Sequence, residues 1–274
     1  ISMPGVPYEM KEMMISEILP AIKAEFKLSH IYHKTVLTQG IGESMLAEMI
    51  EKWEDGLAAS SIKLAYLPQP GMVRLRLSTS GDDENKIRKT VEDEIEKLIP
   101  LIKEYVFGFE NYGEEMPTIE KVTSELLRER KQTLSVAESC TGGYVSSMFT
   151  AIAGSSDIFK GGIVPYTNDA KHDLLNVDNS IFEKHGAVSK ECVIALAENV
   201  RVKLKSDFSI AISGVAGPSG GTPEKPVGFV WISVSDGKKT LAKSFQFGDD
   251  RHRNIVMTAN AAVSFLRKFI LKSI

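Results

Sequence analysis

Apolar strands and amphipathic helices alternate along the second half of this 274-residue chain, and this alternation constrains the fold more than any other feature. It is typical of α/β domains, in which helices cover a largely parallel sheet. Two successive strands, 227–235 and 240–247, indicate an added antiparallel pair. We therefore predict a layered α/β domain with a mixed sheet over residues 117–274. Its other expected elements are helices 119–130, 144–152, 169–175, 189–204 and 251–271 and strands 132–137, 159–166 and 207–213.

Residues 28–110 show a different order, namely strand, helix, two strands and helix. The Pro-Gln-Pro-Gly sequence at 68–71 separates two alternating apolar segments and predicts a hairpin. The helix that follows begins after Asp82 and Asp83, which are good capping residues, and it carries an apolar face. These patterns predict a small α+β domain whose helices cover one face of an antiparallel sheet. The polar residues 111–116 are the expected linker.

A further helix is predicted over residues 8–19, before the first strand. Met10, Met13, Met14 and Ile18 recur at helical spacing, and methionines in such a pattern usually pack against other apolar residues. No preceding segment offers this helix a partner. We therefore expect residues 1–27 to be the C-terminal remnant of a further domain.

Composition argues against several classes of function. The formal net charge is −3 and no stretch is strongly basic, so nucleic-acid binding is not expected. Cys140 and Cys192 are the only cysteines and the five histidines are scattered, so neither a disulfide framework nor a metal site is expected. No segment resembles a signal peptide or a membrane span, which predicts a cytoplasmic protein without membrane contact. The apolar helix faces are compatible with a homodimer.

The segment LSVAESCTGGYVSS places Ser139, Cys140 and Thr141 between a strand and a helix. Ligands of α/β sheets bind at such strand ends, where N–H groups of a helix start can hold an oxyanion or a phosphate. Gly142 and Gly143 let the backbone approach a ligand closely. Two interpretations stay open: Ser139 is a nucleophile, or the hydroxyl side chains only cap the helix. The segment lacks the G-x-S-x-G pattern, and no nearby histidine favours Cys140 as a rival nucleophile.

The segment GGIVPYTNDAKHDLL also leads from a strand into a helix. If Thr167 or Asn168 caps that helix, Lys171 lies in its first turn, where the positive end of the helix dipole lowers the pKa of an amine. A lysine that is partly neutral can take a proton from a serine hydroxyl. Tyr166 would donate to the same site or shape it. The alternative is an exposed surface lysine beside a half-buried tyrosine.

The glycine-rich loop SGVAGPSGGTPEKPVG follows another strand. Its Gly214, Gly217 and Gly220 suit a loop whose N–H groups surround a phosphate or ribose, although a mobile hairpin connection uses the same residues. The loop lacks GxxxxGK[ST], so nucleoside triphosphate hydrolysis is not indicated. Arg251 and Arg253 lie at a helix start, where arginine opposes the dipole but suits a bidentate phosphate contact. The expected ligand is a phosphorylated small molecule.

Four segments together resemble the C-terminal domain of the CinA family, the nicotinamide mononucleotide deamidases: AESCTGGYVSS, IAGSSDIFKGGIVPYTNDAKHDLL, HGAVSKE and SGVAGPSGGTPEKPVGFVWISV. The resemblance covers about residues 117–274. Residues 28–110 resemble the KH-like middle domain of the family. The segment MPGVPYEMKEMM resembles the last helix of its molybdopterin-binding-like first domain, so residues 1–27 are interpreted as the end of that domain.

The resemblance implies that the chain hydrolyses the carboxamide of nicotinamide mononucleotide to nicotinic acid mononucleotide and ammonia. It implies Ser139 as the nucleophile and Lys171 as the base, assisted by Tyr166. It implies no metal and no cofactor for this domain. The residues that it assigns to the oxyanion or to the substrate are Cys140, Thr141, Gly142, Gly143, Gly214, Gly217, Gly220 and Arg251.

The sequence departs from the family in its last motif, where GDR is followed four residues later by a second arginine. Here Asp250 is inserted, and Ile255 stands at the place of the second arginine. Arg251 is carried over as a phosphate ligand, and Arg253 is a candidate substitute for the missing one. The first domain of longer relatives is associated with ADP-ribose pyrophosphatase activity, which is not expected of this chain. Gly40-Ile41-Gly42 is not the GxxG clamp of nucleic-acid-binding KH domains.

The alternative from another class is a non-catalytic interaction protein, associated with competence or DNA damage. The presence of both Ser139 and Lys171 favours the amidohydrolase. A phosphate-ester hydrolase is disfavoured, because the C-terminal domain lacks clustered carboxylates for magnesium.

Overall fold

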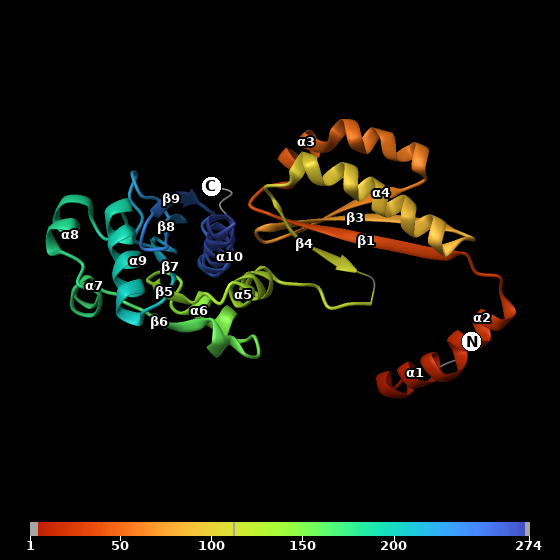
Figure 1. Ribbon diagram of the computed structural model, residues 1–274, viewed down its shortest axis with the longest axis horizontal. Coiled ribbons are helices and arrows are strands. Elements are labelled where there is room, and N and C mark those ends of the chain that lie inside the picture. Colours follow the sequence, from red (N-terminus) through yellow and green to blue (C-terminus); the bar gives the residue numbers. More distant parts are fainter. Residues whose placement is uncertain (1–4, 112, 272–274) are drawn as a thin grey trace.

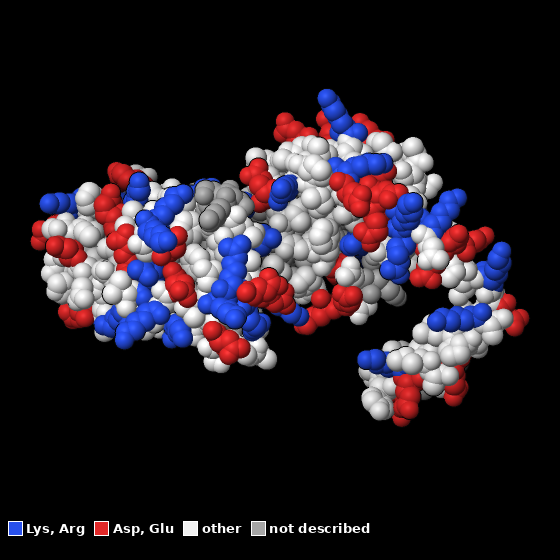
Figure 2. Space-filling view, in the orientation of Figure 1, with Lys and Arg blue, Asp and Glu red and all other residues white. Residues whose placement is uncertain are grey.

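The computed structural model describes residues 5–111 and 113–271, which form two sheets, each with its own helices (Figure 1). Figure 2 shows Lys and Arg interspersed with Asp and Glu over both sheet domains on the face drawn. No helix among the described residues is long and apolar enough to cross a membrane.

The first sheet is antiparallel, with the order β2-β3-β1-β4, and we call it the four-stranded domain. Two helices cover one of its faces, as the sequence predicted, and a cluster of buried aliphatic residues lies between them and the sheet. The last strand was not predicted, because Gly108 interrupts its apolar pattern and its pairing partner lies about seventy residues upstream in the sequence. The elements are β1 (His30–Gln39), α3 (Glu43–Gly56), a 3₁₀ turn (Leu57–Ser60), β2 (Lys63–Gln69), β3 (Met72–Gly81), α4 (Glu84–Ile102) and β4 (Val106–Asn111).

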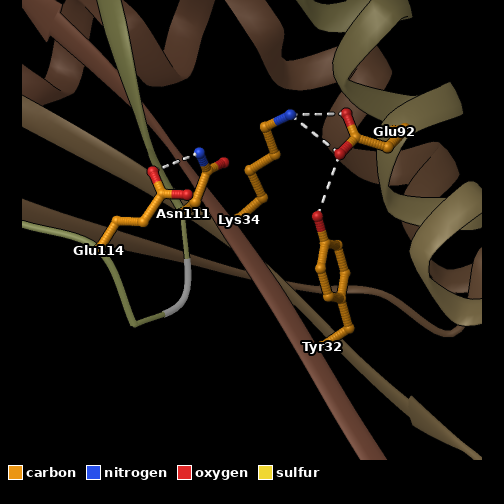
Figure 3. A network of polar contacts seen from close by, with 5 residues as sticks. All are labelled: Tyr32, Lys34, Glu92, Asn111 and Glu114. Atoms are coloured by element: carbon orange, nitrogen blue, oxygen red, sulfur yellow. Dashed lines mark hydrogen bonds and ion pairs between the residues drawn. The ribbon is translucent and has the colours of Figure 1, made fainter. Parts of the chain in front are cut away.

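Helix α4 is tied to β1 by a polar network around Glu92 (Figure 3). The Lys34 Nζ donates to both carboxylate oxygens, at 2.9 and 2.8 Å, and the Tyr32 hydroxyl donates to one of them at 3.0 Å. Asp83 accepts from the Lys86 N–H at 3.1 Å and so caps the same helix, as its position in the sequence predicted. This network fixes the helix against β1, an interior strand of the sheet.

The N-terminal segment forms one helical rod that lies apart from both sheets (Figure 1). It comprises α1 (Pro7–Met13), a π-helical turn (Met14–Ile18) and α2 (Leu19–Glu25), so it extends beyond the predicted end at residue 19. Tyr8 and Ile15 are exposed by 77% and 61%, and only Ile18 of the predicted apolar set is buried. Its assignment to a further domain stays a prediction, and residues 1–4 lie outside the described part.

The second sheet has the order β6-β5-β7-β8-β9, and we call it the five-stranded domain. Strand β5 pairs in parallel with β6 and β7, whereas β8 and β9 add on in antiparallel fashion, so the predicted mixed sheet is confirmed. Helices α5, α6 and α10 pack on one face, and α7, α8 and α9 on the other. The strands are β5 (Leu134–Glu138), β6 (Phe159–Ile163), β7 (Phe208–Gly214), β8 (Phe229–Ser235) and β9 (Thr240–Gln246). The helices are α5 (Ile119–Glu129), α6 (Tyr144–Thr150), α7 (Asn168–Leu175), α8 (Asn179–His185), α9 (Lys190–Leu204) and α10 (Arg251–Ile270), with a 3₁₀ turn at Ser155–Asp157.

Two differences from the predicted elements occur in this domain. Strand β6 ends at Ile163, three residues before the predicted end, so Tyr166 stands in a loop. Helix α8 was not predicted, because it has only seven residues and begins after the inconspicuous cap Asp178. Both differences lie around the segment that carries Lys171.

The two sheet domains share part of one hydrophobic core. Leu37 and Phe107 of the four-stranded domain are buried in the same cluster as Ile119 and the inner face of α10. The Gln39 side chain donates to the Asn260 carbonyl at 3.0 Å, and Arg267 donates to the Val106 carbonyl at 3.3 Å. Helix α10 is therefore the element that joins the two domains.

Candidate active site

The carboxyl ends of β5 and β7 bring Ser139 and the glycine-rich loop together, at the edge of the sheet where α/β proteins bind ligands. Ser139 follows β5 directly, and its backbone N–H donates to the Ile212 carbonyl of β7 at 3.1 Å. Its side chain is 8% exposed. The serine is thus held on a rigid strand end.

Glu138, the last residue of β5, organises the turn after the serine and was not singled out in the sequence. Its carboxylate is fully buried and accepts from the Thr141 hydroxyl at 2.7 Å. It also accepts from the Ser146 hydroxyl at 2.7 Å. Three backbone N–H groups complete its contacts: Gly143 at 3.1 Å, Val145 at 3.0 Å and Ser146 at 2.8 Å. The carboxylate therefore caps α6, whereas the predicted cap, Thr141, only donates to it. The available signal was an acidic residue at the end of a strand, directly before Ser139.

Two of the predicted oxyanion donors have hydrogen-bond partners within the protein. The Gly142 N–H donates to the Ser139 carbonyl at 3.1 Å, and the Gly143 N–H is held by Glu138, so neither is available. These glycines have φ of +62° and +99°, values that only glycine adopts readily, so they serve the tight turn itself. Within residues 5–111 and 113–271, no hydrogen bond runs from the backbone N–H of Cys140 or Thr141 to another residue. These two remain the candidate oxyanion donors.

Lys171 points its amine at the serine. The Nζ donates to Ser139 Oγ at 3.3 Å and to the Tyr166 carbonyl at 3.4 Å. The lysine is 2% exposed, so the alternative of an exposed surface lysine is wrong. Thr167 caps α7 by accepting from the Ala170 N–H at 3.1 Å, which is one of the two caps considered.

Burial lowers the pKa of Lys171 below its usual value of 10.5. The neighbouring thiols of Cys192 and Cys140 act in the opposite direction, but more weakly. Among the described residues, none of the ion pairs within 4.0 Å includes this amine. The position of Lys171 in the first helical turn predicted that the helix dipole would lower its pKa. In the structure, burial of the amine is the main cause of the lowered pKa. The amine is therefore suited to be neutral and to accept a proton.

Cys140 is poorly suited to be a nucleophile. Its side chain is 6% exposed, and burial raises the pKa of its thiol to about 12. The second cysteine, Cys192 of α9, is fully buried, and burial raises the pKa of its thiol to about 11. Because the thiolate is the reactive form, both thiols are unreactive near neutral pH.

Arg251, at the start of α10, links the glycine-rich loop to the segment that carries Tyr166 and Lys171. It donates to the Tyr166 hydroxyl at 3.0 Å and to the Gly217 carbonyl at 2.6 Å. Tyr166 is 55% exposed, which agrees with the expected half-buried tyrosine. Both Arg251 and Lys171 lower the pKa of the Cys140 thiol, which places the two cations around one point. Arg251 therefore makes the side of the site around Tyr166 and Gly217 cationic.

Packing accounts for two of the three loop glycines. A Cβ on Gly214 would lie 2.6 Å from the Val230 side chain, and a Cβ on Gly217 would lie 2.5 Å from the Val227 side chain. Gly220 has φ of +88°, and a Cβ there would make only an ordinary contact with the Val215 side chain at 3.9 Å. The Asn254 side chain donates to the Ala216 carbonyl at 3.0 Å, which anchors the start of the loop.

Arg253 lies elsewhere. It lines a cavity of about 640 Å³ between the tip of the β2–β3 hairpin and the start of α10, which does not include Ser139 or Lys171. Asp250, the inserted residue, caps α10 by accepting from the Arg253 N–H at 2.6 Å. The structure therefore brings Arg251, and not Arg253, to Tyr166. Among the described residues, no group of three or more His, Cys, Asp or Glu is arranged to hold a metal ion.

Two family models match this chain. The model of the CinA C-terminal domain matches residues 116–270, and that of the damage-inducible protein CinA KH domain matches residues 33–108. The chain belongs to the CinA family. The four-stranded domain is thus the CinA KH domain, and the site described above lies in the CinA C-terminal domain.

Relatives and solved structures agree with this membership. A CinA-like protein of Flavobacterium psychrophilum is 44% identical over 273 residues, which are 100% of this chain and 64% of that protein. A CinA-like protein of Amoebophilus asiaticus is 43% identical over 98% of this chain and 63% of its own length. The chain thus spans less than two thirds of the length of these relatives.

The solved structures correspond to the C-terminal part. A CinA superfamily protein of Klebsiella pneumoniae has a TM-score of 0.54 at 28% identity and covers 57% of this chain and 99% of its own. The competence/damage inducible protein CihA of Agrobacterium tumefaciens has a TM-score of 0.52 at 34% identity, over 56% of this chain and 96% of its own.

Proposed function

We propose that this CinA protein is an amidohydrolase that converts nicotinamide mononucleotide to nicotinic acid mononucleotide and ammonia. The observation that carries the proposal is the pair of Ser139 and Lys171, whose Oγ and Nζ lie 3.3 Å apart. A buried amine without a carboxylate partner, facing a serine hydroxyl at a strand end, is the arrangement that a serine nucleophile with a lysine base requires. The choice of substrate rests on the family resemblance.

The reaction would proceed in two steps. Ser139 Oγ attacks the carboxamide carbon while neutral Lys171 takes the hydroxyl proton, and the lysine then returns this proton to the departing nitrogen, which leaves as ammonia. In the second step water attacks the carbon of the resulting ester while neutral Lys171 takes a proton from the water. Lys171 then returns this proton to the departing Ser139 Oγ, which releases the carboxylic acid and regenerates the serine hydroxyl and the neutral amine. The backbone N–H groups of Cys140 and Thr141 are the proposed donors to the oxyanion in both steps.

The nucleotide phosphate would bind at Arg251. Its guanidinium is exposed, is held by Tyr166 and Gly217, and stands on the cationic side of the site. A planar guanidinium suits a phosphate through two parallel hydrogen bonds. Neither of the two proposed steps uses a metal ion or a cofactor.

The test measures ammonia released from nicotinamide mononucleotide by the chain and by Ser139→Ala and Lys171→Met. Loss of the nucleophile should lower kcat by at least about 10⁴-fold, and loss of the base by about 10²–10⁴-fold. Ser147→Ala and Lys160→Met change an exposed serine of α6 and an exposed lysine of β6, and both should keep full activity. A wild-type chain that releases no ammonia, or a folded Ser139→Ala variant that keeps its activity, would refute the proposal in favour of a non-catalytic interaction protein.

A further inference from the structure

A second cavity lies between the two sheet domains, apart from Ser139. It encloses about 820 Å³, where β9 and α10 face the start of α3 (Figure 1). Ligand sites of 300–1,000 Å³ occur preferentially at such domain junctions. Its wall in the five-stranded domain carries Leu241, Phe245, Phe247, Met257 and Phe265.

The apolar wall has the shape of an aromatic platform. The rings of Phe245 and Phe247 are nearly parallel, with an interplanar angle of 7° and centroids 5.9 Å apart. Both side chains are half-buried rather than closed off by the protein. Met72 of β3 and Met257 of α10 complete the wall, and thioethers adapt readily to aromatic ligands.

Two amines border this platform. Lys243 Nζ stands 5.4 Å above the Phe245 ring, and Lys268 Nζ stands 5.1 Å above the Tyr105 ring. Neither takes part in any ion pair within 4.0 Å among the described residues. Burial lowers the pKa of Lys268, the nearby Lys243 lowers it further, and Glu104 only partly offsets this. An anion between the two amines would relieve their repulsion.

One buried polar group of the cavity lacks a partner. Gln39 is 4% exposed and lines the cavity, and its amide nitrogen donates to the Asn260 carbonyl. Its Oε1 is buried and has no hydrogen-bond partner among the described residues. This oxygen is closed to solvent as well, so it is not a contact for a ligand in the cavity, and Gln39 contributes to the wall only.

We propose that this cavity binds a small organic anion that combines an apolar ring system with one sulfonate, phosphate or carboxylate group. The ring system packs against the apolar wall of Phe245, Phe247 and Met257, and the anionic group lies near Lys243 and Lys268. Glu43 and Glu104 at the rim disfavour a dianion. The site is independent of the amidohydrolase proposal, because it contains neither Ser139 nor Lys171.

The test uses 8-anilinonaphthalene-1-sulfonate, which combines a naphthalene and a phenyl ring with one sulfonate, and N-phenyl-1-naphthylamine, which lacks the sulfonate. Fluorescence titration of the folded chain should give one saturable site for the sulfonate dye. Lys268→Met should weaken this dye about tenfold, which is about 1.4 kcal/mol, and leave the neutral dye within about twofold. The control Lys238→Met, at the exposed β8–β9 turn, should change neither.

A second variant tests the place of binding. Ala261 lines the cavity on α10, so Ala261→Trp should fill it and weaken both dyes at least tenfold. If circular dichroism shows that this variant does not fold, the affinities of the two dyes for Lys268→Met still test the proposal. Equal binding to all variants would place the dye on other apolar surface, such as the exposed helix 7–25, and would overturn the proposal. Equal weakening of both dyes by Lys268→Met would also overturn it, because the anion would then not contact this amine.

Discussion

Lys171 is a base because of where its side chain lies rather than because of its sequence neighbours. The helix dipole acts on any amine in a first turn, but the charged form of Lys171 is penalised mainly by burial. The neutral amine can accept the serine proton, and the protonated amine cannot. The proposed chemistry therefore couples the rate to the protonation of one residue.

The predicted consequence is a pH profile with a single limb on the acidic side. Because the pKa of Lys171 lies below 10.5, the neutral fraction grows as the pH rises and is lost as the pH falls through that lowered pKa. We expect kcat/KM for nicotinamide mononucleotide to fall about tenfold per pH unit below this value. Tyr166→Phe should lower the rate without moving the limb. A rate that stays flat into acidic solution, with the protein folded, would contradict a lysine base.

Helix α6 is short, and its start depends on a residue of the preceding strand. Gly143, its N-cap, has no side chain, so the N–H groups of the first turn are satisfied by the Glu138 carboxylate instead. The same contacts close the turn that carries Ser139. The Glu138 carboxylate therefore both caps α6 and positions Ser139.

Glu138→Gln tests this role with a side chain of the same size. The amide has one acceptor oxygen and brings an NH₂ group against N–H donors, so several of the five contacts are lost. We expect the free energy of unfolding, measured with urea, to fall by about 3 kcal/mol. The proposed activity should fall through kcat, since Ser139 is displaced. Glu183→Gln, an exposed acid of α8, is the matched control and should change neither quantity; a Glu138→Gln variant as stable as wild type would contradict the capping role.

The elements that could be predicted are those whose signals are local. Strand β5, the hairpin at 68–71 and the cap Asp83 are set by neighbouring residues, and the structure confirms them. Strand β4 could not be recognised, because its place depends on pairing with the distant β1. The pairing of Glu138 with α6 likewise needs the folded turn.

The site shows the same division. Strand ends and helix starts were enough to propose Ser139 and Lys171 as candidates, and the structure brings them to 3.3 Å. Their burial, and the loss of Gly142 and Gly143 as donors, depend on contacts across the turn that no periodicity reveals.

At the scale of the whole molecule, the two sheet domains are not independent folding units, because they share buried residues. Phe107 of β4 is 5% exposed and belongs to the same buried cluster as Ile119 and α10. The sequence pattern predicts Phe107 to pack inside the four-stranded domain. In the structure it packs at the contact between the two sheet domains instead.

Phe107→Ala should therefore destabilise the five-stranded domain, although the residue lies in the other one. The expected loss is about 3–5 kcal/mol, as for other buried phenylalanines, and it should appear in both domains. The chain has two tryptophans, so Trp53→Phe leaves Trp231 of β8 as the only reporter, and Trp231→Phe leaves Trp53 of α3. Urea unfolding should shift at both reporters, whereas Leu101→Ala, a 43% exposed position on α4, should shift neither by more than about 1 kcal/mol. A Trp231 transition that Phe107→Ala leaves in place would mean that the shared core does not couple the domains.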